Sequence, residues 1–364
     1  MDGWVRQYRA YLRDPGGTRP PSEEQLERLR GRYCRFEDAF DDDGVLIGGE
    51  VVTARLDTPR PLLHLLASHH AEPFGQWGSF WDQHRGGFSC VDSVLAGRMT
   101  SHLDTNYVPT APQPQDVREF FIHEAGASWP MFPVAGYQAD RYEHVECRLG
   151  LDTYRLSCAR AGLECTLAVC VHPTLPLEIW RVALGNLSAA GGPRKLSWFF
   201  RLPVNVDSYP SYYFVPRVVC EGRLDVGAMV FVNHDQNNKH PRSAFLAADE
   251  PLDGYDMMAE AFDGGPRRAP VPAAAARGRC FDTPGLQPYA GLVAAGQFDA
   301  ELAAGSRRTW TLAFGKCPTD EAGRRAFLAA VRRDVLGRAG EVAGELAGLW
   351  RAKVRRQAIV TPDR

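Results

Sequence analysis

The sequence has little that would direct it to nucleic acid, a membrane or a metal ion. Its 44 Asp and Glu nearly balance its 42 Lys and Arg, giving a formal net charge of -2. Such a chain has no broad basic surface for nucleic acid or an anionic membrane. No apolar run reaches roughly 18 residues, so we expect no membrane-spanning helix. The N-terminus lacks the apolar core of a signal peptide, which predicts a cytoplasmic protein.

Cysteine and histidine patterns that would indicate metal binding are also missing. The nine cysteines include no Cys-x-x-Cys pair, and the ten histidines include no His-Glu-x-x-His motif. We therefore predict no metal site and no cofactor, and we expect buried free thiols in a reducing compartment. Residues 41–43 are three aspartates, but their spacing fits no EF-hand loop and is typical of a solvated turn.

The clearest pattern that is present is a period of two within residues 143–187. Apolar side chains occupy every second position of one segment: Leu163, Cys165, Leu167, Val169 and Val171. Residues 153–158 and 177–187 repeat the pattern, and Gly162 and residues 172–176 supply turns between them. This alternation predicts an antiparallel β-meander.

Further segments of this kind make the fold class mainly β. We expect strands at 62–67, 118–123, 195–203, 228–233, 297–304 and 308–314. Trp129 and Pro130 end the second of these, residues 263–278 form a low-complexity loop, and residues 304–306 form a hairpin turn between the last two strands. These strands define a sandwich domain at 33–318.

Helical patterns flank this sandwich. Residues 1–32 form an N-terminal extension in which Ser22 opens a short helix. After Pro318 the period becomes helical, with Thr319 capping a helix to about 335 and a second helix spanning 339–357. Residues 319–358 are thus two linker helices. Residues 359–364 contain Thr-Pro-Asp, a helix-start signal.

Two stretches mix aromatic residues with glycine, at 74–81 and 85–89. Such stretches are typical of sharply bent loops whose rings pack on something else. Packing in the core is the favoured interpretation, although the apolar face of a sugar also stacks on an aromatic ring. Trp77, Trp81 and Phe88 are therefore candidates for sugar contact.

An ordered set of short motifs resembles the N-terminal region of glycoside hydrolase family 94, which contains cellobiose and chitobiose phosphorylases and cyclic β-1,2-glucan synthases. The motifs keep their order and spacing over residues 33–364. They are Asp57-Thr58-Pro59-Arg60-Pro61, Gly86-Gly87-Phe88-Ser89, Arg98-Met99-Thr100, Cys147-Arg148-Leu149-Gly150-Leu151, Leu177-Glu178-Ile179-Trp180, Asn186-Leu187-Ser188, Glu260-Ala261-Phe262 and Thr361-Pro362-Asp363.

The resemblance implies a β-supersandwich of the galactose-mutarotase type, joined by linker helices to an (α/α)6 barrel. In the family the barrel carries the catalytic acid, and inorganic phosphate is the co-substrate. We expect that acid to lie beyond Arg364, so no residue of this chain is predicted to be catalytic. The expected function is a non-catalytic sandwich subunit or domain that shapes the sugar site of a separate catalytic unit. Expected partners are an oligosaccharide or sugar phosphate, and a barrel chain or a second copy.

The resemblance also suggests which residues contact substrate. Arg148 matches a family arginine implicated in substrate or phosphate contact, and a guanidinium fork suits both ligands. Phe88 stands where the family has a tyrosine, and Leu149 replaces a family histidine. Trp77, Trp81 and Arg98 complete the expected substrate-binding set. The alternative for Arg148 is a structural ion pair with a carboxylate such as Glu146.

Two other functions remain open from the residues alone. A free-standing mutarotase-like epimerase or lyase would need paired acid and base groups in a concave face. The adjacent pairs that offer them are His123 with Glu124, His144 with Glu146, and His234 with Asp235. A pure carbohydrate-binding module is the third interpretation.

Overall fold

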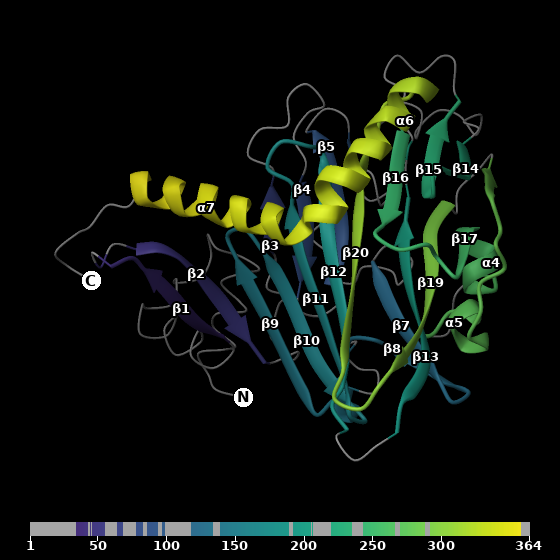
Figure 1. The fold of residues 1–364 in the computed structure, drawn as a ribbon, viewed down its shortest axis with the longest axis horizontal. Coiled ribbons are helices and arrows are strands. Elements are labelled where there is room, and N and C mark those ends of the chain that lie inside the picture. Colours follow the sequence, from purple (N-terminus) through teal and green to yellow (C-terminus); the bar gives the residue numbers. More distant parts are fainter. Residues whose placement is uncertain are drawn as a thin grey trace, which may run out of the picture.

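We analysed a computed structural model of the chain. It describes residues 34–42, 44, 46–54, 64–67, 78–82, 86–93, 97–98, 118–133, 139–188, 192–204, 206, 220–234, 243–265, 270–287 and 292–357. The expected helix at 22–32 and the Thr-Pro-Asp segment lie outside these residues. Within them the structure is an antiparallel β-supersandwich with helices on its outer faces (Figure 1).

The largest sheet has eleven antiparallel strands and contains the meander. Its spatial order is β1-β2-β9-β10-β11-β12-β20-β16-β15-β14-β18. The strand bounds are β1 Arg35–Phe40, β2 Leu46–Thr53, β9 His144–Gly150, β10 Tyr154–Arg160, β11 Leu163–Val171, β12 Leu177–Asn186, β14 Cys220–Asp225, β15 Ala228–Asn233, β16 Ser243–Ala248, β18 Gly285–Gln287 and β20 Arg307–Lys316. The predicted meander is confirmed as β9 to β12.

Two smaller sheets accompany the large one. A five-stranded sheet has the order β17-β19-β13-β7-β8, and a four-stranded sheet has the order β3-β4-β5-β6. Their bounds are β3 His64–Ala67, β4 Gly78–Asp82, β5 Gly86–Ser93, β6 Gly97–Arg98, β7 Glu119–Glu124, β8 Ala127–Pro130, β13 Arg194–Pro203, β17 Gly254–Met258 and β19 Leu292–Leu302.

Apolar side chains at every second position of the strands form the core between the large and five-stranded sheets. On β12, Trp180, Val182 and Leu184 point to this inner side, as the sequence predicts. The Trp198 ring of β13 stacks on Phe298 of β19 and meets Trp310 of β20 edge-on, with centroid distances of 4.8 and 5.4 Å. Because β13 and β20 lie in different sheets, this aromatic contact joins them directly.

Helices cover the outer face of each of these sheets. Helices α4 Ala259–Asp263 and α5 Ala273–Arg277 lie on the five-stranded sheet, where Phe262 and Ala275 are buried. Helix α6 Glu321–Ala330, a π-helical turn Val331–Val335, a 3-10 turn Leu336–Arg338 and helix α7 Ala339–Gln357 cross the outer face of the large sheet (Figure 1). Val342 and Leu346 attach α7 to this face, whereas Leu349 remains 45% exposed.

Several local expectations were wrong. The strand β7 ends at a two-residue turn in which Ala125 and Gly126 both have positive φ, so Trp129 and Pro130 belong to the next strand. The predicted hairpin at 304–306 is a turn between sheets, because β19 pairs with β13 and β17 while β20 pairs with β12 and β16.

Three further corrections concern segments expected to be loops or a cap. Residues 86–89 lie within strand β5, and part of the expected loop 263–278 is helix α5. Helix α6 is capped by Asp320 rather than Thr319, because the Asp320 carboxylate accepts a hydrogen bond from the amide of Gly323. Among the described cysteines, six are buried free thiols and Cys34 is partly buried.

A buried ion pair joins the three sheets. Arg118, immediately before β7, lies 2.8 Å from the carboxylate of Glu178 on β12, and the side chains are 1% and 0% exposed. Arg118 also donates to the hydroxyl of Ser79 on β4 and lies over the ring of Trp81, 4.7 Å from its centroid. The indole of Trp180 donates to Glu178. Each charge is thus matched by partners, which is what permits its burial.

Removing one member of this pair should be costly. We expect Arg118→Met to lower the free energy of unfolding by about 3–5 kcal/mol, because it leaves the Glu178 carboxylate buried without its counter-charge. The double variant Arg118→Met/Glu178→Leu should recover much of the loss. Equilibrium urea unfolding of the single and double variants measures both effects.

The matched control for this prediction is Arg307→Met. Arg307 pairs with Glu164 across 2.9 Å, but the two side chains are 50% and 35% exposed. Exposed pairs contribute about 0–1 kcal/mol, so this variant should change stability little. Equal losses for Arg118→Met and Arg307→Met would mean that burial does not set the contribution of the pair.

The turn between β11 and β12 should make stability depend on pH. His172 accepts hydrogen bonds at Nδ1 from the amides of Thr174 and Leu175, and burial lowers its pKa to about 4. Between about pH 6.5 and pH 4 the unfolded chain therefore binds a proton that the folded ring does not. Stability should fall as pH falls through this window, by on the order of 3 kcal/mol.

Thermal unfolding between pH 4 and 7 tests this expectation with a near-isosteric variant. His172→Asn retains an acceptor for the two amides and cannot be protonated, so its stability should decline less on acidification. His144→Asn, at an exposed position of β9, serves as the control. Parallel pH profiles for wild type and His172→Asn would contradict the assignment.

Candidate functional site

One cavity in the described part of the chain gathers polar and aromatic side chains from distant segments, and we name it the α7 cavity. It has a volume of about 430 Å³ and lies between the β1–β2 hairpin, the turn from β9 to β10, and α7. Its lining consists of Glu37, Asp38, Ala39, Ile47, Gly48, Gly49, Glu50, Leu151, Asp152, Thr153, Arg155, Ala347, Trp350 and Arg351.

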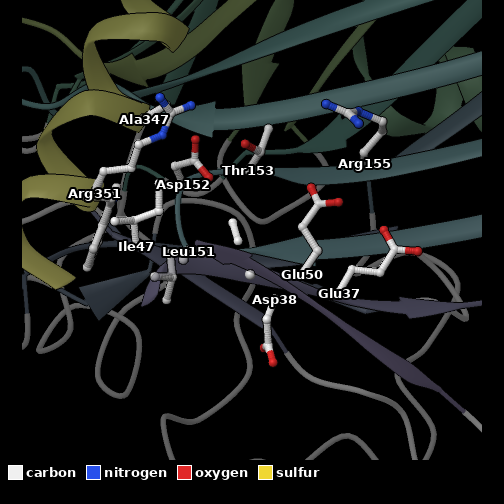
Figure 2. Close-up of a pocket in the computed structure, with 14 residues that line it drawn as sticks. Glu37, Asp38, Ile47, Glu50, Leu151, Asp152, Thr153, Arg155, Ala347 and Arg351 are labelled. Carbon is white, nitrogen blue, oxygen red and sulfur yellow. The ribbon is translucent and has the colours of Figure 1, made fainter. Parts of the chain in front are cut away.

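Figure 2 shows how charged groups are distributed around the α7 cavity. Arg351 and Asp152 occupy the end beside α7, whereas Arg155, Glu50 and Glu37 lie at the opposite end. Local structure explains this placement. Gly150 ends β9, and the amide of Gly150 bonds to the carbonyl of Thr153, so the intervening turn projects its side chains beside α7.

Beside the cavity, Arg148 is the centre of an ion-pair network. Its Nε lies 2.6 Å from Glu146, and its Nη1 lies 2.6 Å from Glu37 and 2.9 Å from Glu50. Arg35 adds further pairs to Glu37 and Glu146. The ion-pair alternative for Arg148 is therefore present in the structure. A substrate or phosphate role for Arg148 stays a prediction, and phosphate would have to compete with three carboxylates.

The network fixes the charge states of its acids. The hydrogen bond from Arg148 is the largest influence on both Glu37 and Glu146, and it lowers the pKa of each carboxyl. Arg35 acts in the same direction on both. These acids are thus anionic at neutral pH. A general acid for glycoside chemistry needs the opposite, a raised pKa.

The other expected substrate-binding residues do not join this cavity. Trp81 is fully buried, packs against Tyr154 and Trp180, and donates its indole N–H to Ser79. Its expected sugar contact is wrong in this structure because the ring has no exposed face, and core packing is the correct interpretation. The inner side of β4 places Trp81 in the core, whereas Arg148 lies on the outer side of β9.

The remaining three residues are only partly within the described structure. Phe88 lies in β5, opposite the register shift between Phe80 and Trp81, and Arg98 of β6 pairs with Val91. Their side chains, and all of Trp77, lie outside the described residues. Their proposed sugar contacts stay predictions.

The histidine pairs that would serve an epimerase or lyase have other partners. The Nδ1 of His123 is 2.7 Å from the hydroxyl of Ser128, while Glu124 pairs with Arg194. His234 lies 2.8 Å from Glu221, and Asp235 is outside the described residues. His144 is exposed on β9. These contacts are structural and form no acid–base pair around the α7 cavity.

Sequence reasoning missed the cavity itself. Arg155, Asp152, Trp350 and Arg351 were not among the expected site residues, because they carry no motif that marks them as a set. The one sequence feature that could have indicated the cavity is Trp350, a large aromatic residue near the end of an amphipathic helix. In the described ranges, no group of three His, Cys, Asp or Glu side chains could hold a metal ion, and no helix is long and apolar enough to cross a membrane.

Comparison with known families identifies the fold. The model of the family "Glycosyl hydrolase 94, supersandwich domain" matches residues 50–332. The chain belongs to this family. The family 94 resemblance of its motifs is therefore confirmed, and the matched region extends from β2 into the helices beside the large sheet.

Individual proteins are similar to this chain at low identity. The solabiose phosphorylase of Paenibacillus borealis is 26% identical over 249 residues, which cover 65% of this chain and 30% of the relative. A kojibiose phosphorylase from the human microbiome aligns structurally over 87% of this chain and 37% of its own, with 9% identity and a TM-score of 0.47. A bacterial glucoamylase complexed with acarbose aligns structurally over 88% of this chain and 40% of its own, with 7% identity and a TM-score of 0.45. The family 94 chain thus spans less than a third of its curated relative.

The Arg148 network yields a testable stability difference. We expect Arg148→Met to lower the free energy of unfolding at pH 7 by about 1 kcal/mol, because ion pairs at exposed sites are weak individually. Glu37 and Glu146 have lowered pKa values, so their contribution exists above about pH 4.5 and disappears as pH falls through the folded values. The difference from wild type should therefore shrink below pH 4.5.

Urea unfolding at pH 7 and at low pH measures this difference. Arg155→Met is the matched control. Arg155 lies on β10 directly across from Arg148, and among the described residues it forms no ion pair. This variant should leave stability nearly unchanged at both pH values. A loss for Arg148→Met that is independent of pH would assign the effect to packing of its aliphatic stem.

Proposed function

We propose that this chain is the β-supersandwich unit of a family 94-like glycoside phosphorylase and that it acts with an (α/α)6 catalytic unit. The sandwich would shape the sugar site, and the catalytic unit would supply the carboxylic acid that protonates the leaving oxygen while phosphate attacks the sugar. The observation that carries the proposal is the family match over residues 50–332. The similarity to the solabiose phosphorylase of Paenibacillus borealis supports the reaction class.

The charge states or locations of three described carboxylates are consistent with a non-catalytic sandwich. Glu37 and Glu146, beside the α7 cavity, are held anionic by Arg148. Burial raises the pKa of Asp256, but this residue is fully buried and accepts hydrogen bonds from the amides of Phe281 and Thr283. The first two acids have the wrong protonation state for a general acid, and the third has the wrong location.

Reconstitution with a catalytic unit tests the proposal. The partner would be an (α/α)6 polypeptide of the same family, taken from the genomic neighbour of this chain and beginning at its own Thr-Pro-Asp motif. We expect the two polypeptides to co-elute in size-exclusion chromatography. The mixture, and neither part alone, should convert a disaccharide and inorganic phosphate into a sugar 1-phosphate and a free monosaccharide.

The substrate panel would contain solabiose, kojibiose and cellobiose, with product measured by phosphate consumption and by chromatography. Omission of phosphate should abolish turnover, which separates phosphorolysis from hydrolysis. Two results would overturn the proposal. One is turnover by this chain alone, and the other is separate elution of the two polypeptides with no gain of activity in the mixture.

A further inference from the structure

We propose that the α7 cavity is a binding site for a neutral disaccharide, and that it discriminates against sugar phosphates. This inference goes beyond the proposed function, because binding would be a property of the sandwich and α7 by themselves. It rests on the size of the cavity, its aromatic and guanidinium groups, and its charge.

The cavity has the size and composition of a small-ligand site. Its volume of about 430 Å³ lies within the roughly 300–1,000 Å³ of known ligand pockets. Trp350 supplies a large flat apolar surface, and Ile47 and Leu151 add aliphatic surface to the lining. Leu151 is 42% exposed, so ligand contact would remove apolar area from water. A sugar ring presents C–H groups to such surfaces.

The polar groups of the lining suit hydroxyls. Arg155 and Arg351 present guanidinium donors, and within the described chain neither is seen in an ion pair that would occupy them. Asp152 and Glu50 present carboxylate acceptors between them (Figure 2). A hydroxyl both donates and accepts, so a polyol can satisfy donors and acceptors that are mixed in this way.

The negative charge of the cavity lining disfavours an anionic ligand. The lining has four carboxylates, on Glu37, Asp38, Glu50 and Asp152, against the guanidinium groups of Arg155 and Arg351. The nearby guanidinium of Arg148 is engaged by Glu37 and Glu50. Within the lining itself the acidic groups outnumber the basic groups by four to two, and by four to three when the adjacent Lys353 is counted. A phosphate would meet net repulsion here, whereas a neutral sugar would not.

A second cation on α7, besides Arg351, lies beside the aromatic ring of Trp350. The Nζ of Lys353 is 4.9 Å from the centroid of the Trp350 ring, so the two side chains form a cation–π contact. This contact constrains the orientation of the ring before any ligand arrives. A preorganised aromatic wall lowers the entropy cost of binding.

Isothermal titration calorimetry on the full chain tests the inference. Cellobiose and kojibiose are the neutral probes, and glucose 1-phosphate is the anionic probe at the same low ionic strength. We expect measurable binding of at least one neutral disaccharide and at least about tenfold weaker binding of glucose 1-phosphate, which corresponds to about 1.4 kcal/mol. The titration needs no catalytic unit, so its outcome is independent of the reconstitution experiment.

Variants locate the site. Trp350→Ala should weaken disaccharide binding by about tenfold. Leu349→Ala, one residue earlier on α7, should leave binding unchanged, because Leu349 is 45% exposed and does not line the cavity. Asp152→Asn keeps the side-chain shape and removes one negative charge. It should therefore reduce the difference in affinity between the disaccharide and glucose 1-phosphate. Because Asp152 does not belong to α7, this variant still tests the site if Trp350→Ala displaces the helix from the sheet.

Any one of four outcomes would overturn the inference. If neither neutral disaccharide binds, the cavity is not a sugar-binding site. Tighter binding of glucose 1-phosphate than of the disaccharides would make it an anion site. Equal effects of Leu349→Ala and Trp350→Ala, or an unchanged affinity and selectivity in Asp152→Asn, would place binding elsewhere.

Discussion

The buried pair of Arg118 and Glu178 is the constraint on which the arrangement of the three sheets depends. Its members and immediate contacts come from β12 of the large sheet, from the residue preceding β7 of the five-stranded sheet, and from β4 of the four-stranded sheet. Separating the large and five-stranded sheets would part Arg118 from Glu178 and leave each charge without its partner. Removing the four-stranded sheet would take the Ser79 hydroxyl and the Trp81 ring away from Arg118. The motif Leu177-Glu178-Ile179-Trp180 therefore has a structural explanation. Glu178 and Trp180 point inward to the ion pair and core, while Ile179 points outward beneath the helices.

The sequence was informative about strands, whose apolar side chains repeat regularly along the chain. Alternation over residues 163–171 predicted β11, because a strand that buries one face must repeat its apolar side chains every second residue. It was uninformative about partners that are distant in sequence. The three carboxylates around Arg148 include Glu37 and Glu50, about a hundred positions earlier, and no local pattern marks that encounter. The burial of Trp81 likewise depends on packing between sheets, since glycine-rich aromatic stretches occur in loops and strands alike.

The motif Cys147-Arg148-Leu149-Gly150-Leu151 shows how one short stretch serves two surfaces. Cys147 and Leu149 are buried in the core between the sheets. Arg148, on the opposite side of the same strand, holds the carboxylates of β1 and β2 beside the cavity. Gly150 ends the strand, and Leu151 begins the turn that lines the cavity. Family membership therefore accounts for these residues through architecture, and it requires no direct contact between Arg148 and phosphate.

Helix α7 couples the stability of the sandwich to the state of the cavity. Val342 and Leu346 anchor its first half on the large sheet. Trp350, about one turn later, packs against the same apolar cluster and, together with Arg351, also lines the cavity. A ligand that contacts this part of α7 as well as the turn after β9 binds better when the helix is docked. By linkage, such a ligand must stabilise the docked helix by the same free energy. Any partner that shifts α7 would in turn change the affinity of the cavity, so the helix is the element through which a catalytic unit and a sugar on the sandwich would influence each other.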